Sequence, residues 1–296
     1  MREIARTLAA FSILTMGVAA CGQSWQSAVG DAARKSPEAR IVVLDVVSGR
    51  LMASHRLDEA ARTLASPGST LKPLLLYRLL TAGRWEADHR VACDRRLAIA
   101  GHRLACTHPP ALPFDSRQAL AWSCNSYFAE VARSLRPGEL GSLLAPTGLL
   151  ASTGLSPREA TADLPEPRTL TAMELAVLGV DGVRVTPLEL AAAYRWLAQE
   201  LAVHPRSAAA ATVRAGLEDS ASFGMAGPAN LGGVPVAGKT GTAEGAASSQ
   251  THGWFVGMAP AENPQIVVAV YLPTGRGADA ARVAGELLAS SPLRKP

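Results

Sequence analysis

The chain has 296 residues, of which 48% are hydrophobic and 18% are charged, and its formal net charge is +4. This composition excludes an intrinsically disordered protein, and the length suits one large core or two subdomains. The positive charge does not indicate a nucleic-acid partner, because the arginines are scattered along the chain and aromatic residues make up only 5%.

Residues 1–21 have the pattern of an export signal. Two arginines within the first six residues form a basic start, and an apolar stretch at 8–18 is followed by small residues. The apolar stretch is too short to span a bilayer comfortably. Residues 18–21, Val-Ala-Ala-Cys, resemble a bacterial lipoprotein cleavage site, so we expect Cys21 to carry a lipid; plain cleavage or an uncleaved anchor is the alternative. All three place the rest of the chain outside the cytoplasm.

The segment after the signal predicts a helix and then a β-hairpin. Apolar residues at 25–33 recur at helical spacing, within a linker that we place at 22–39. A β-branched run at 41–46 is followed by a Ser-Gly turn and a second short apolar run at 51–54, as in a hairpin.

Residues 66–72, Ser-Pro-Gly-Ser-Thr-Leu-Lys, place a hydroxyl and an amine one helical turn apart. The Pro-Gly pair and the apolar run at 74–80 predict a helix that begins near Ser69, with Lys72 on the same face. The helix dipole opposes a lysine in the first turn, and burial would lower its pKa further. A neutral amine can then accept the proton of the hydroxyl, so Ser69 is the candidate nucleophile and Lys72 its base. The competing interpretation is a helix cap beside an ordinary surface lysine.

Three cysteines remain after Cys21. Cys93 and Cys106 flank a predicted hairpin at 94–105, and we expect them to form a disulfide, as the oxidising compartment favours. The rival is a metal site that uses both cysteines and two nearby histidines: Cys93, His102, Cys106 and His108. No standard zinc spacing fits that set. Cys124 is then expected to be a packed, unpaired thiol.

The middle of the chain is mainly helical in pattern, and its end is mainly strand-like. Repeated Pro and Gly at 136–168 predict loops. The predicted helices cover 117–122, 124–135, 172–178, 187–201, 207–223 and 279–289, and the predicted strands cover 234–242, 253–258 and 265–272. Strands at both ends with helices between them favour an α+β fold over a parallel βαβ sheet.

Three short motifs occur in a fixed order along the chain: S-x-x-K at 69–72, S-x-N at 123–125 and K-T-G at 239–241. Penicillin-binding proteins and class A β-lactamases carry this triple, with the middle motif in its S-D-N form. On these motifs the chain resembles the penicillin-binding protein transpeptidase family from about residue 39 to 288. The longer matching stretches are 67–73, 123–128, 185–191, 239–244 and 252–257.

The resemblance implies a fold and a domain boundary. The expected fold is α+β, with a five-stranded antiparallel sheet flanked by helices and an all-helical subdomain built from the middle of the chain. The expected transpeptidase-like catalytic domain covers residues 40–290.

The resemblance also implies roles for the motif residues. Ser69 would attack the carbonyl of a peptide that ends in D-alanyl-D-alanine, or of a β-lactam, with Lys72 as base. Ser123 would relay a proton, and Asn125 would bind the substrate backbone and Lys72. Lys239, Thr240, Gly241 and Thr242 would bind the substrate carboxylate on a strand edge, with Gly241 leaving room for substrate. The backbone N–H groups of Ser69 and Thr242 would form an oxyanion hole.

The expected function is that of a lipid-anchored, extracytoplasmic, penicillin-binding serine D,D-transpeptidase that uses no cofactor or metal. Its expected partners are peptidoglycan stem peptides, β-lactams, the membrane and cell-wall synthesis proteins, and not nucleic acid. The alternatives are a D,D-carboxypeptidase, a β-lactamase or a non-turnover β-lactam or muropeptide sensor. Cys124 stands where class A β-lactamases have Asp, and the residues after Glu166 do not continue as they do in those enzymes, so slow release of the acyl group is expected.

Overall fold

The computed structural model describes residues 24–109, 113–244 and 250–293. The predicted export signal and Cys21 lie outside the described residues. Within these ranges no helix is both long enough and apolar enough to cross a membrane.

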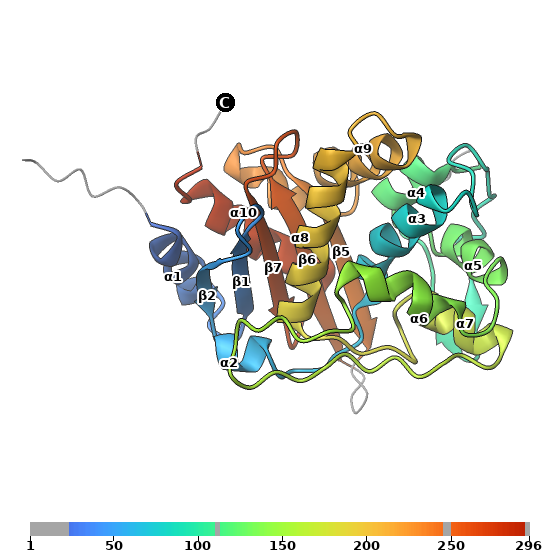
Figure 1. Cartoon of the computed structure of the whole chain (residues 1–296), viewed down its shortest axis with the longest axis horizontal. Coiled ribbons are helices and arrows are strands. Elements are labelled where there is room, and N and C mark those ends of the chain that lie inside the picture. The colour runs from blue at the N-terminus through green and yellow to red at the C-terminus, as the bar shows by residue number, and fades with distance from the viewer. Residues whose placement is uncertain (1–23, 110–112, 245–249, 294–296) are drawn as a thin grey trace, which may run out of the picture.

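A five-stranded antiparallel sheet forms the centre of the molecule, as expected from the family resemblance. Its order is β2-β1-β7-β6-β5, so the N-terminal hairpin pairs with the C-terminal strands through β1 and β7. The strands are β1 (Arg40–Asp45), β2 (Leu51–His55), β5 (Ala237–Glu244), β6 (Thr251–Ala259) and β7 (Ile266–Leu272). All residues of β7 are buried, because helices cover the sheet on both faces (Figure 1).

The two faces of the sheet belong to separate apolar clusters. In β1, Ile41 and Val43 pack with α1 (Trp25–Lys35) and α10 (Gly277–Ala289) on one face. Val42 and Leu44 lie on the other face, which α8 (Pro187–Val203) covers. Alternate residues of a strand point to opposite faces, which explains why a short, wholly apolar run serves both clusters.

A mainly helical subdomain, which was expected to be all-helical, lies beside the β5 edge of the sheet (Figure 1). Its helices are α3 (Lys72–Thr81), α4 (Ser116–Ala121), α5 (Asn125–Arg133), α6 (Glu139–Leu144), α7 (Leu170–Val177) and α9 (Ala208–Ser222). The predicted hairpin at 94–105 is present as β3 (Ala98–Ile99) and β4 (His102–Arg103). The arrangement confirms the predicted α+β fold class.

Four short helical segments were not predicted. They are α2 (Leu57–Ala60) and the 3-10 turns η1 (Gly68–Leu71), η2 (Ala145–Thr147) and η3 (Gly227–Gly232). The region 136–168, expected to be loop, also contains α6, which buries Leu140, Leu143 and Leu144. Six residues show too little periodicity for the pattern to reveal a helix beside so many Pro and Gly residues.

Candidate active site

Ser69 lies in a 3-10 turn that leads directly into α3. The turn is η1, and Lys72 is the first residue of the α-helix, with Pro73 behind it in the first turn. Pro is tolerated there because its missing N–H would have no partner in the helix. The helix therefore starts close to the predicted position, and Ser69 is half-buried and lines a large pocket.

Backbone packing between this turn and the sheet fixes the position of Ser69. A Cβ atom on Gly68, whose φ is +56°, would lie 2.8 Å from the backbone nitrogen of Thr242 in β5. The Ser66 carbonyl accepts hydrogen bonds from His252 Nε2 (2.7 Å) and Trp254 Nε1 (2.9 Å) in β6. Ser69 is thus held against β5 and β6 by residues that take no part in the three motifs.

Gly241 allows a close backbone approach that the sequence did not predict. A Cβ atom there would overlap the carbonyl oxygen of Pro67 and lie 3.1 Å from the side chain of Thr70. The glycine therefore allows β5 to approach the turn that carries Ser69.

Lys72 is fully buried, and its hydrogen-bond partners among the described residues are all uncharged. Its Nζ donates to Asn125 Oδ1 (2.6 Å) and to the Ser123 carbonyl (3.1 Å), and lies 3.5 Å from Ser123 Oγ. Burial lowers the pKa of Lys72 to about 8, against a smaller opposing influence of nearby cysteine thiols. An amine with this pKa is neutral in a useful fraction of molecules near neutral pH, as a general base must be.

Ser123 lies between two buried lysines. Its Oγ accepts a hydrogen bond from Lys239 Nζ at 2.8 Å, and its backbone has a left-handed φ of +56°. Such a backbone costs a non-glycine residue about 1 kcal/mol or more. Asn125 opens α5, and its Nδ2 donates to the Leu104 carbonyl at 3.0 Å. The S-x-N loop is therefore held in one conformation by contacts at both ends.

Lys239 is also fully buried, on β5. Burial and the neighbouring charge of Lys72 lower its pKa well below the ordinary value. Beyond Ser123, the acceptor of its amine is the Thr240 carbonyl at 3.0 Å, and no carboxylate is among the acceptors recorded for either lysine in the described residues. Two cationic groups with no anionic partner make this region attractive to an anion.

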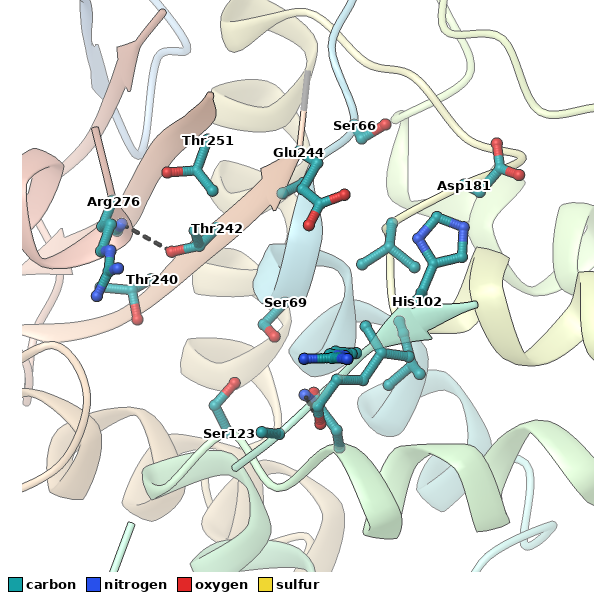
Figure 2. A pocket seen from close by; sticks show the side chains of 18 of the residues that line it. Ser66, Ser69, His102, Ser123, Asp181, Thr240, Thr242, Glu244, Thr251 and Arg276 are labelled. Atoms are coloured by element: carbon teal, nitrogen blue, oxygen red, sulfur yellow. Dashed lines mark hydrogen bonds between the residues drawn. The ribbon is translucent and has the colours of Figure 1, made fainter. Parts of the chain in front are cut away.

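The pocket has a volume of about 1100 Å³ and opens over these groups. Figure 2 shows that the hydroxyls of Ser69, Ser123, Thr240 and Thr242 surround the same space. Lys72 and Lys239 lie behind its wall and reach it through Ser123 and Asn125. Arg276 also lines the pocket, on the loop before α10, and nothing in the sequence singled it out.

The seven predicted motif residues and the adjacent Thr242 therefore converge on one region, although Thr242 lies 173 positions after Ser69 in the sequence. Glu166, the carboxylate considered for a β-lactamase, does not line the pocket. Its Oε1 lies beside Gly138 in the helical subdomain.

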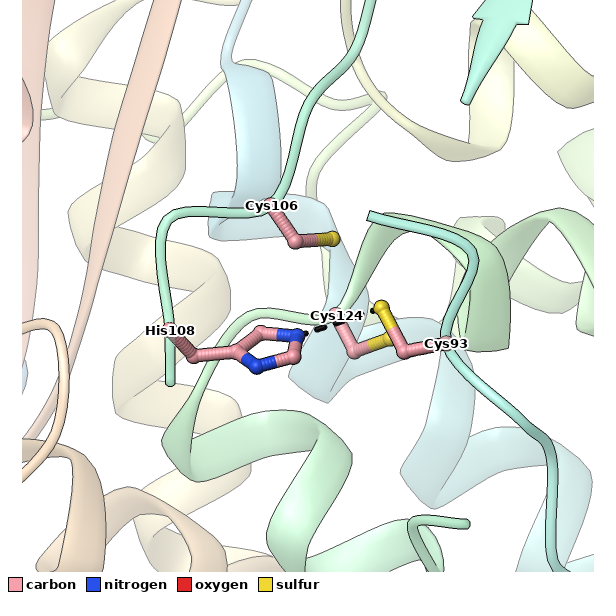
Figure 3. Close-up of side chains that lie close together, drawn as sticks. All are labelled: Cys93, Cys106, His108 and Cys124. Carbon is pink, nitrogen blue, oxygen red and sulfur yellow. Dashed lines mark hydrogen bonds between the residues drawn. The ribbon is translucent and has the colours of Figure 1, made fainter. Parts of the chain in front are cut away.

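The predicted disulfide between Cys93 and Cys106 is wrong for this structure, because both residues are free thiols, as is Cys124. The side chains of Cys124 and His108 lie beside those of Cys93 and Cys106. The three sulfurs and a ring nitrogen of His108 all lie within 4.8 Å of one another (Figure 3). The rival metal set differs from this cluster in one member, since His102 lies on β4 and lines the large pocket, and Cys124 is in the cluster instead.

Residues 39–291 match the family described as the penicillin binding protein transpeptidase domain. A curated relative, the peptidoglycan D,D-transpeptidase PbpA of Mycolicibacterium smegmatis, is 24% identical over 257 residues, which are 75% of this chain and 52% of the relative. The chain thus spans about half the length of this curated relative.

Solved structures share the fold. A peptidoglycan glycosyltransferase from Burkholderia ambifaria has a TM-score of 0.75 at 22% identity, with 89% of this chain and 90% of that chain covered. The transpeptidase domain of Burkholderia pseudomallei penicillin-binding protein 3 has a TM-score of 0.75 at 23% identity, with 89% and 91% covered. A chain described in a peptidoglycan synthase complex has a TM-score of 0.72 at 20% identity, with 90% and 59% covered. Because the family match runs through most of the sequence, from residue 39 to 291, the protein belongs to the penicillin-binding protein transpeptidase domain family.

Proposed function

We propose that the protein is a penicillin-binding serine D,D-transpeptidase that acts through an acyl-enzyme on Ser69. The observation that carries this proposal is the environment of Lys72, an amine buried among uncharged groups with a pKa of about 8. Such an amine can take the proton of Ser69 when the hydroxyl attacks a carbonyl. Family membership and the name of the curated relative support the same activity.

In the proposed reaction Ser69 Oγ attacks the penultimate D-alanine carbonyl of a stem peptide. The bond to the terminal D-alanine breaks, and Ser123, between Lys72 and Lys239, passes a proton to the leaving amine. The product is an ester on Ser69 and free D-alanine. An amine of a second stem peptide then attacks the ester, forms the cross-link and returns the proton to the site.

Substrate binding is assigned to β5. The terminal carboxylate of the peptide would bind to Thr240 and Thr242 and to the charge of Lys239. This carboxylate would be the anionic partner that the two buried lysines lack among the described residues. Asn125 would bind the peptide backbone from the opposite side of the pocket, and the N–H groups of Ser69 and Thr242 would stabilise the oxyanion, with about 3 kcal/mol per donor. β-Lactams would enter the same place as mimics of the substrate.

The proposal extends to location and partners. Residues 1–21 would direct export, and Cys21 would carry the lipid anchor. Residues 22–39 would link this anchor to a catalytic domain at 40–290. The domain would work outside the cytoplasm, with peptidoglycan as its substrate. The similarity to a chain of a peptidoglycan synthase complex supports cell-wall synthesis proteins as partners. Membrane fractionation tests the anchor: Cys21→Ser is expected to release the protein or block its processing, and a soluble wild-type protein would contradict it.

The test of the activity is a turnover assay with a pentapeptide that ends in D-Ala-D-Ala, with and without an amine acceptor such as D-methionine. The wild type is expected to release D-alanine and to form the exchanged peptide. Ser69→Ala should abolish both products, whereas Ser142→Ala, a change at an exposed serine on α6, should keep them. Hydrolysis without exchange would instead identify a carboxypeptidase.

A further inference from the structure

Three cysteines and one histidine meet behind the S-x-N loop. Cys93, Cys106, His108 and Cys124 each direct one ligand atom into a space where no two of these atoms are more than 4.8 Å apart (Figure 3). Cys124 is fully buried, and Cys106 and His108 are 8% and 2% exposed. The activity described above uses none of the four side chains. From this geometry we infer that Cys93, Cys106, His108 and Cys124 bind a zinc ion.

The histidine is already in the form that a metal requires. His108 Nδ1 lies 2.7 Å from the Pro109 carbonyl, which can only accept a hydrogen bond, so Nδ1 carries the proton. Nε2 is then unprotonated, and its lone pair is available to bind a metal. It lies 3.1 Å from Cys93 Sγ. A backbone carbonyl that fixes the far nitrogen in this way is the usual support of a metal-bound histidine.

The ligand set and its spacing fit zinc. Zinc binds thiolate sulfur at about 2.3 Å and imidazole nitrogen at about 2.0 Å, so ligand atoms around a tetrahedral ion lie roughly 3.5–3.8 Å apart. The cluster needs only a small contraction from its present 4.8 Å limit. Three sulfurs and one nitrogen suit zinc rather than magnesium or calcium, which prefer oxygen, and four protein ligands describe a closed structural site.

Zinc binding would release protons from the cysteines and change the charge of the site. The three thiols would lose their protons as zinc binds, and the neutral histidine would keep its Nδ1 proton, which leaves the complex with one net negative charge. The backbone N–H of Asn125 donates to Cys106 Sγ at 3.2 Å, so one sulfur already has a hydrogen bond of the kind that supports thiolates. The cation of Lys72 lies nearby, bonded to the side chain of the same Asn125.

The site would position the catalytic loop without touching substrate. Cys124 lies between Ser123 and Asn125, the two residues that hold Lys72, while Cys93, Cys106 and His108 come from the segment around the β3–β4 hairpin. Zinc would therefore tie this hairpin segment to the start of α5. Mutation of groups that orient a metal site typically costs about 10- to 100-fold in metal affinity or activity, and we expect a loss of acylation of similar size without zinc. Zinc binding does not depend on the proposed function, whereas its effect on acylation does.

The test begins with metal analysis of the full-length protein in detergent. The wild type is expected to contain one zinc per chain by elemental mass spectrometry. Replacement by Co²⁺ should give the strong visible bands and thiolate charge-transfer bands of a tetrahedral site. His108→Gln should lose the zinc, and His204→Gln, at an exposed histidine after α8, should retain it.

A second measurement tests the positioning role. Removal of zinc by a chelator should lower the rate constant for acylation by a fluorescent penicillin about tenfold, with unchanged far-UV circular dichroism, and added zinc should restore it. The restoration should fail in His108→Gln.

Other outcomes overturn the assignment. A wild type without bound metal, a Cys–Cys disulfide revealed by a mass two hydrogens lower, or iron or copper at full occupancy would each contradict a zinc site. Full zinc content with no penicillin labelling would leave the zinc site standing and contradict the proposed function instead.

Discussion

Lys239 Nζ and Ser123 Oγ form a 2.8 Å hydrogen bond that joins the edge strand of the sheet to the helical subdomain. Lys72 lies 3.5 Å from the same oxygen, so one hydroxyl lies between two fully buried amines. Burial lowers the pKa of both amines, and the charge of Lys72 lowers the pKa of Lys239 further. The state in which both amines are protonated is therefore disfavoured, and one neutral amine can act as a base.

The rate of acylation is expected to depend on the protonation of Lys72. With a pKa of about 8, the neutral amine becomes ten times rarer for each pH unit below that value. The second-order rate constant for penicillin should therefore rise about tenfold between pH 6 and 7 and level off above pH 8. Stopped-flow fluorescence measures this profile, and a flat profile from pH 6 to 8 would rule out Lys72 as the base.

Lys72→Arg should remove nearly all acylation although it keeps the positive charge. A guanidinium remains protonated at any pH used for proteins and cannot accept the proton of Ser69. Arg78→Lys in α3 serves as the matched control, because it exchanges the same two residue types in the opposite direction at a position that does not line the pocket. Labelling with fluorescent penicillin should fall at least about 100-fold in Lys72→Arg and stay normal in the control; comparable labelling of both would contradict the assignment.

Removing the Lys72 amine should stabilise the fold while it destroys activity. The unfolded lysine has a pKa near 10.5 and the folded one about 8, so the unfolded chain binds the proton more tightly. The free energy of unfolding should then rise with pH between about 8 and 10.5, by about 3 kcal/mol from this group.

Urea titrations of Lys72→Met should therefore show a gain of about 1–3 kcal/mol at pH 7 that shrinks towards pH 10. If the variant is less stable than the wild type at pH 7, burial of the Lys72 amine does not destabilise the fold, and the prediction is contradicted.

Gly241→Ala should misplace Ser69. The new methyl group would overlap the Pro67 carbonyl and force β5 away from the nucleophile's turn, at a cost of about 1–3 kcal/mol in stability. Gly141→Ala is the matched control, because nothing lies within 4 Å of a Cβ atom at that position of α6. Thermal melting and penicillin labelling should both drop for Gly241→Ala alone, and equal behaviour of the two variants would disprove the close approach.

The penicilloyl-enzyme should persist for an hour or longer. Glu166 does not line the pocket and so cannot direct water at the ester on Ser69. A lifetime of one hour corresponds to a barrier of about 22 kcal/mol, compared with about 17 for one second. Intact-mass measurements should show the adduct for hours in both wild type and Glu166→Gln, whereas release within seconds that slows in the variant would indicate a β-lactamase.

Local motifs indicated the candidate site residues, because S-x-x-K, S-x-N and K-T-G each carry their chemistry within four residues. The convergence of Ser123 and Lys239 depends on packing between the helical subdomain and β5, and periodicity contains no information on it. The family resemblance supplied the sheet that joins β1 to β7. The support of the Ser66 carbonyl by His252 and Trp254 was not predicted, since a carbonyl acceptor has no signature in the sequence.

The cysteine cluster shows where a local argument fails. Cys93 and Cys106 flank a real hairpin, which made a disulfide between them reasonable. Cys124 was assigned to the motif around it, and His108 was considered only in the rival metal set with His102, although the fold places Cys124 and His108 beside the sulfurs of Cys93 and Cys106. The close approach of the Pro67 carbonyl to Gly241 was not predicted for a related reason, because the motif does not reveal which distant backbone atom packs against the glycine.

Peptide mapping of the protein after reaction with benzylpenicillin identifies the acylated residue. We expect one penicilloyl group per chain, on the peptide that contains Ser69, and no adduct in Ser69→Ala. A modified residue elsewhere, or an unchanged yield of adduct in Ser69→Ala, would contradict the assignment of Ser69 as the nucleophile.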